Sequence, residues 1–83
     1  KDQTILPEKK DLVGTMSTPL SYSSPKLPGL GDVDWSKFIS ALTDIRYKGF
    51  VVLEVEDKAF EENLEDRVKA VIQSKKYIEQ FLI

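Results

Sequence analysis

The chain has 83 residues and a net charge of −2, and it contains neither cysteine nor histidine. This length allows at most one small domain, and the missing residue types exclude disulfides and thiol or imidazole metal ligands from this segment. Acidic and basic residues are interspersed without a basic stripe, so nucleic-acid binding is not expected. We find no apolar run of membrane-spanning length and no apolar signal core at the start, so no membrane contact and a cytoplasmic location are expected.

Residues 3–34 are predicted to form one long connection. Four prolines, the Ser-rich stretch STPLSYSSP and the turn sequence PGLGD all interrupt regular structure. Within this region, TILP is at best the end of a strand, and PEKKDL is compatible with a short helical turn that starts at Pro7. A connection of this length is often a functional loop, although a flexible linker has the same composition.

Residues 35–47 are predicted to form a helix. Asp34 is a suitable N-cap because its side chain can accept a backbone N–H of the first turn. Gly49 is expected to supply the left-handed residue that ends the helix or turns the chain into the next strand. The apolar residues that recur at helical spacing are Trp35, Phe38, Ile39, Leu42 and Ile45.

Residues 50–56 are predicted to form a strand, and residues 63–82 a second helix. FVVLEV is rich in β-branched residues and does not alternate with polar ones, which is typical of a parallel strand buried on both faces. Asn63 is the expected N-cap of the second helix. The expected buried face of that helix consists of Leu64, Val68, Val71, Ile72, Ile78 and Leu82.

Glu54 stands out because it is a carboxylate inside an apolar strand. Side chains alternate across a strand, so Glu54 and Glu56 should share one face near the carboxyl end, where open α/β sheets and barrels bind ligands. Two carboxylates on one face favour a shared cation, and a divalent metal with oxygen ligands would satisfy them. From the residues alone, an ordinary salt bridge to Lys or Arg, or a solvated strand end, is the more common arrangement for such a carboxylate.

The sequence resembles the C-terminal part of the xylose-isomerase-like sugar phosphate isomerase/epimerase family. The resemblance rests on KD at the start and on PGLGDVDWSKFISALTDIRYKGFVVLEVED, and it covers nearly the whole chain. Where the family has Gly before the Tyr of its GY-x-G motif, this chain has Arg46, and where the family often has His, it has Val55. The resemblance implies an α/β fold, with residues 1–83 as the last part of one (β/α)8 TIM-barrel domain: long loop, helix, parallel strand and helix.

The resemblance also implies a site and a reaction. Glu54 falls on a ligand of the family's divalent metal ion, which is Mn, Mg, Co or Zn, and it would also act as the acid or base. Asp2 and Glu56 are possible substrate contacts or partners of the ligands. The substrate would be a sugar or sugar phosphate, isomerised or epimerised by proton transfer next to a carbonyl. A His is expected just before Lys1, and the 83 residues alone should be inactive, since further metal ligands would also lie upstream.

Two alternatives stay open at this point. Metal-dependent endonucleases share this barrel and similar metal ligands. A non-catalytic fragment would instead associate through its exposed strand edges, and an oligomer is expected from such edges.

Overall fold

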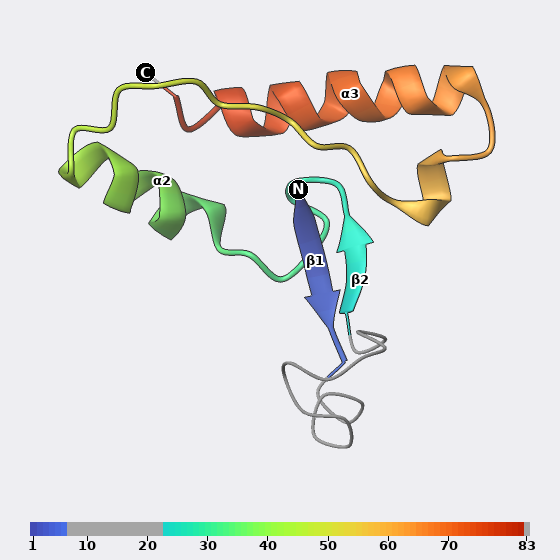
Figure 1. Cartoon of the computed structure of the whole chain (residues 1–83), viewed down its shortest axis with the longest axis horizontal. Coiled ribbons are helices and arrows are strands. Elements are labelled where there is room, and N and C mark those ends of the chain that lie inside the picture. The colour runs from blue at the N-terminus through green and yellow to red at the C-terminus, as the bar shows by residue number, and fades with distance from the viewer. Residues whose placement is uncertain (7–22, 83) are drawn as a thin grey trace.

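The computed structural model describes residues 1–6 and 23–82. Its elements are strands β1 (Asp2–Ile5) and β2 (Ser23–Lys26), helix α2 (Trp35–Asp44), the short 3₁₀ helix η1 (Lys58–Phe60) and helix α3 (Leu64–Glu79) (Figure 1). The chain is therefore a small mixed α/β structure with two antiparallel strands and two helices in the part described. The predicted helical turn at PEKKDL lies outside these residues.

The ends of the predicted loop form a two-stranded antiparallel ribbon. Asp2 pairs with Lys26 and Ile5 with Ser23, so residues 3–34 are not one structureless connection. The suggestion of a strand at TILP is confirmed for Thr4 and Ile5. Strand β2 was missed because it reads SSPK, and proline normally marks a break. A proline is tolerated here because β2 is an edge strand of a two-stranded sheet.

A tight turn follows β2, and its first residue, Leu27, belongs to the buried core. The N–H of Leu30 donates to the carbonyl of Leu27 at 2.9 Å, and Gly29 has a φ of 96°. Pro28 fixes its own φ, and Gly29 accepts a left-handed conformation without a Cβ penalty, so the Pro-Gly pair suits this turn. The side chain of Leu27 is fully buried.

Helix α2 begins where the sequence predicts and ends earlier. The Asp34 carboxylate accepts the N–H of Lys37 at 3.1 Å, which confirms the N-cap. The helix ends at Asp44, and Arg46, not Gly49, takes the left-handed conformation with a φ of 56°. The expectation for Gly49 was wrong because the chain turns three residues before it, at a position that a glycine would fill with less strain.

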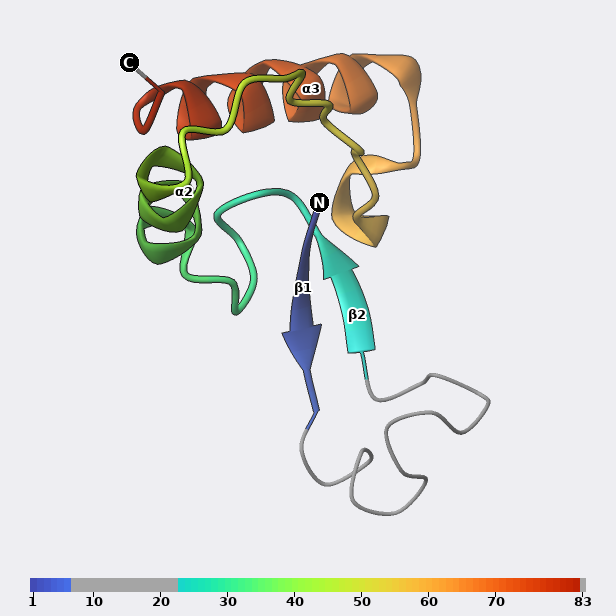
Figure 2. The same cartoon turned by 60° about the vertical axis from the view of Figure 1, so that its left-hand side comes forward.

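The predicted strand at residues 50–56 is not paired. Among the described residues, the backbone of Val51 through Glu56 makes no hydrogen bond, and this segment runs along α3 in both views (Figures 1 and 2). The sequence has the composition of a buried strand, but a strand exists only beside a neighbour that accepts and donates its backbone hydrogen bonds. Strands β1 and β2 pair with each other instead.

Helix α3 (Leu64–Glu79) buries Ile78, as predicted, but none of the other apolar residues expected on its buried face. Asn63 caps its first turn by accepting the N–H of Asp66 at 2.8 Å, as expected. The buried positions are Ala70, Ser74 and Ile78, whereas Leu64 and Val68 are exposed. Val71, Ile72 and Leu82 are between 44% and 49% exposed.

The molecule is flat, with principal extents of 41 × 36 × 17 Å. A thickness of 17 Å leaves no room for a second layer on both sides of the 50–56 segment, because packed layers lie about 10 Å apart. Phe50 is accordingly 92% exposed and Val52 is 82% exposed. No helix within residues 1–6 and 23–82 combines the length and the apolar character needed to cross a membrane.

Candidate functional site

Two carboxylates meet one amine beside the start of β1. The Nζ atom of Lys1 lies 3.4 Å from Oε2 of Glu56 and 3.6 Å from Oε1 of Glu54. Both carboxylates thus reach the same side of the 50–56 segment, as the alternation of an extended chain predicts. The hydrogen bond from Lys1 to Glu56 and the negative charge of Glu54 raise the pKa of the Lys1 amine.

This ion pair is weak because water reaches all three groups. The side chains of Glu54 and Glu56 are 65% and 43% exposed, and that of Lys1 is 41% exposed. Solvent-exposed pairs contribute little to stability because water and salt screen them. The structure therefore realises the salt bridge that the sequence left open for Glu54, but the pair is too weak to hold the carboxylate against a stronger cation.

Asp2 is the most heavily hydrogen-bonded side chain of the site, and it is buried. Its Oδ1 accepts the N–H groups of Gln3 and Val33 at 2.7 and 3.1 Å. Its Oδ2 accepts the N–H groups of Gly29 and Gly31 at 3.0 and 3.2 Å. The same oxygen accepts the indole Nε1–H of Trp35 at 2.8 Å. The carboxylate thus holds the turn of residues 29–35 against the first strand.

These hydrogen bonds keep Asp2 ionised. Burial alone would raise the pKa of Asp2, but hydrogen bonds from Trp35, Val33, Gln3 and Gly29 together hold it below its ordinary value. Five donors also fill the lone-pair positions of the carboxylate, which number about four. Asp2 therefore has no free oxygen position for a metal ion.

Sequence reasoning missed two residues that shape this region. Lys1 contacts both glutamates, yet a single lysine at a strand start carries no pattern that predicts such a contact. Asp57 has a side chain only 2% exposed, and it accepts the N–H of Leu27 at 3.2 Å and that of Ala59 at 3.1 Å. Asp57 is also the N-cap of η1, and no sequence pattern predicts its contact with the turn after β2.

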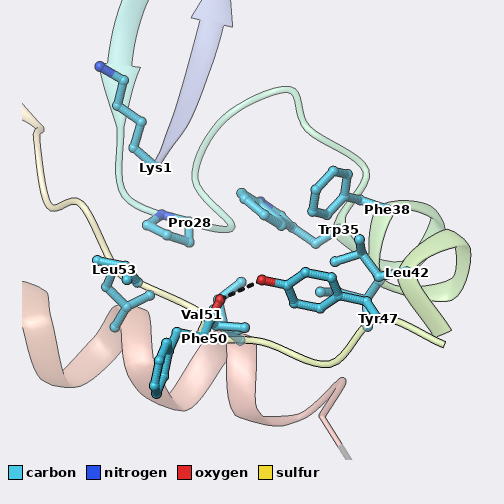
Figure 3. A pocket seen from close by; sticks show the side chains of 12 residues that line it. Lys1, Pro28, Trp35, Phe38, Leu42, Tyr47, Phe50, Val51 and Leu53 are labelled. Atoms are coloured by element: carbon cyan, nitrogen blue, oxygen red, sulfur yellow. Dashed lines mark hydrogen bonds between the residues drawn. The ribbon is translucent and has the colours of Figure 1, made fainter. Parts of the chain in front are cut away.

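A pocket of about 340 Å³ opens between α2, α3 and the 50–53 segment (Figure 3). Tyr47 donates its hydroxyl hydrogen to the carbonyl of Phe50 at 2.9 Å beside this pocket. The lining is almost entirely apolar, and Lys1 is the single charged residue in it: Lys1, Pro28, Trp35, Phe38, Ile39, Leu42, Tyr47, Phe50, Val51, Val52, Leu53 and Ile78. Glu54 and Glu56 are not part of it. The pocket is an uncovered packing surface rather than a polar binding site.

Glu54 and Glu56 do not form a metal site by themselves. Their oxygens are the hard ligands that Mg²⁺ and Mn²⁺ prefer, and the amine of Lys1 shows that a cation can approach both at once. In the part of the chain that the structure describes, no three Asp or Glu side chains gather closely enough to hold a metal ion. The two glutamates fit a divalent cation only together with ligands from other residues.

Comparison with known proteins gives no assignment: no family model, no curated protein and no solved structure matches this chain.

Proposed function

We propose that this chain is the C-terminal segment of a cytoplasmic, divalent-metal-dependent sugar or sugar phosphate isomerase or epimerase with a TIM-barrel fold. In this proposal Glu54 is a metal ligand and the acid or base that moves a proton next to the substrate carbonyl. The metal ion polarises the carbonyl oxygen when it is bound. Other ligands come from strands outside this segment, so the 83 residues alone are inactive.

The observation that carries the proposal is the meeting of KD with EVED, two motifs that lie more than 50 residues apart. Lys1 contacts both Glu54 and Glu56 across this separation. In a barrel the ends of neighbouring strands lie side by side, and this is where the family's metal site would be. The weak amine contact leaves Glu54 free to exchange its partner for a metal ion.

The conformation of Arg46 gives separate support. Its φ of 56° favours glycine, and the resembled family has a glycine at this position. A backbone that turns as the family's glycine would allow is consistent with the resemblance, even though the side chain differs.

A proton-exchange experiment tests this function. The protein that contains this segment together with its upstream strands is incubated with Mn²⁺ and a panel of ketoses and ketose phosphates in D₂O. We expect deuterium to enter the substrate at the carbon next to the carbonyl, observed by NMR, and EDTA to stop the exchange. The 83-residue chain alone serves as the control and should exchange none. Metal-independent exchange, or no exchange with any sugar of the panel, would contradict the proposal.

A second candidate function is association through the segment at residues 50–55. It is favoured by the backbone of residues 51–55, which makes no hydrogen bond to the described parts of the chain, and by the exposed side chains of Phe50 and Val52. Light scattering of the 83-residue chain should then show an oligomer that Val52→Lys disrupts. Val71→Lys, on the exposed side of α3, is the matched control and should leave the oligomer intact. A monodisperse wild-type monomer would exclude this candidate.

A further inference from the structure

We infer that Asp2 is a positioning residue, which fixes the turn of residues 29–35 and thereby aims Lys1 at Glu54 and Glu56, and that it is neither a metal ligand nor an acid or base. This inference deepens the proposed function and rests on it for the role of the glutamates. The contacts of Asp2 stand independently of any activity.

The first step is that the turn is built around the Asp2 carboxylate. The donors that converge on it come from alternate residues of one short stretch, Gly29, Gly31 and Val33, and from the indole of Trp35. Backbone N–H groups that point into one concavity stabilise an anion, as successive N–H groups do in an anion-binding nest. Here the anion belongs to the protein itself.

The second step is that the carboxylate needs glycine in the turn beside it. A Cβ atom at Gly31 would lie 2.5 Å from Oδ1 of Asp2 and 2.5 Å from the carbonyl oxygen of Gln3. A Cβ atom at Gly29 would lie 2.7 Å from the ring of Tyr77 on α3. The two glycines of PGLGD are therefore spaces that let the carboxylate on one side and the aromatic ring on the other approach the turn.

The third step connects the turn with the glutamates. Asp32 donates its N–H to the carbonyl of Gln3 at 2.7 Å, and its carboxylate accepts the N–H of Ile5 at 2.7 Å. These contacts and those of Asp2 hold β1 along its length. Lys1 is adjacent to Asp2 in the chain, so fixing Asp2 limits where the Lys1 amine can reach. Loss of the Asp2 carboxylate should release both the turn and the amine.

The single tryptophan makes the experiment specific. Trp35 is the only tryptophan of the chain, so its indole N–H gives one resolvable signal in a ¹H–¹⁵N NMR spectrum. In the wild-type chain we expect this hydrogen to exchange slowly with solvent, because it is donated to Asp2. In Asp2→Asn, whose NH₂ group would face other donors, we expect exchange to be about tenfold faster, as for the loss of one hydrogen bond. Asp34→Asn is the matched control because Asp34 is the aspartate next to Trp35 and bonds elsewhere; it should leave the indole signal unchanged.

If Asp2→Asn does not fold, a pH titration of the wild-type chain tests the bond between Trp35 and Asp2 instead. The indole signal should keep its position as the pH falls to about 4 and should move only below the usual Asp range, where Asp2 becomes protonated. Asp34→Asn must show the same step, because the pKa of Asp34 is also lowered. An indole signal that exchanges freely, or that does not titrate, would overturn the inference.

Metal binding separates this inference from the proposed function. In the protein with its upstream strands, we expect Asp2→Asn to weaken Mn²⁺ binding by about 10- to 100-fold, as for a residue that acts through others, and by less than Glu54→Gln does. If it weakens binding as strongly as Glu54→Gln does, Asp2 is a ligand and the inference is wrong while the function stands. If the wild-type protein binds no Mn²⁺, the proposed function fails, and the indole signal still tests the role of Asp2 in the turn.

Discussion

Replacing Glu54 by Gln in the enzyme that we propose is expected to lower kcat/KM by about 10³-fold or more. The amide has nearly the same shape as the carboxylate, but it is neutral and cannot take up the substrate proton. General acid–base catalysis contributes about 10²–10⁴-fold in enzymes, and loss of a charged metal ligand adds to this. The measurement is steady-state kinetics with saturating Mn²⁺, together with the Mn²⁺ dissociation constant of each variant.

Glu56→Gln is the matched control for this experiment. Glu56 lies two residues away, contacts the same Lys1 amine and is also partly exposed. We expect it to lower kcat/KM by about 10- to 100-fold, and by less than Glu54→Gln does, since it would only support the site. Equal losses from both changes would mean that the two carboxylates act as a pair. If Glu54→Gln left kcat/KM and Mn²⁺ binding unchanged, Glu54 would not be a metal ligand.

Gly31→Ala is expected to destabilise the chain by about 2–3 kcal/mol. The added methyl group would meet Oδ1 of Asp2 and the carbonyl oxygen of Gln3, each 2.5 Å away. Neither atom can move freely, because the carboxylate is held by five donors and the carbonyl accepts the N–H of Asp32. Overpacking of a filled site typically costs about 1–3 kcal/mol, and the displaced hydrogen bonds add to that cost. Urea unfolding monitored by Trp35 fluorescence measures the change.

Gly49→Ala is the control for steric crowding without a fixed neighbour. Its Cβ would lie 2.5 Å from the hydroxyl oxygen of Tyr47, which is the far end of a side chain that is 49% exposed. Tyr47 can rotate away, at the cost of its single hydrogen bond to the carbonyl of Phe50. We expect a loss of about 1 kcal/mol. A Gly31→Ala chain no less stable than Gly49→Ala would show that the turn adapts easily.

Local signals in the sequence predicted local structure well. Asp34 and Asn63 were identified as N-caps and both accept an N–H of their helix, because capping depends on residues within one turn. The Pro-Gly turn at residues 28 and 29 was likewise readable, since its conformation follows from the two residues themselves. These predictions needed no knowledge of what lies beside the segment.

The predictions that depended on neighbours failed in this chain. The segment at residues 50–56 has strand composition, but pairing needs a partner that β1 and β2 do not provide. The buried residues of α3 are Ala70, Ser74 and Ile78, so Ile78 alone confirms the predicted apolar face. Hydrophobic periodicity shows which side chains favour burial, but not which side has something to pack against.

The candidate site could be predicted only in outline. The alternation rule placed Glu54 and Glu56 on one side, and both do reach Lys1. The role of Asp2 was not readable, because its donors come from residues 29–35 and only the fold brings them together. Its saturation by hydrogen bonds follows from three-dimensional contacts alone.

The Asp2 carboxylate, which the turn of residues 29–35 binds, has one more consequence. A loop that binds a dissolved anion is ordered only when that anion is abundant, because binding costs translational freedom. Asp2 is tethered to the loop by the chain, so its local concentration is fixed by the polypeptide rather than by the buffer. The anion that this turn binds is part of the same chain, so the order of the turn should not depend on the ionic composition of the cell.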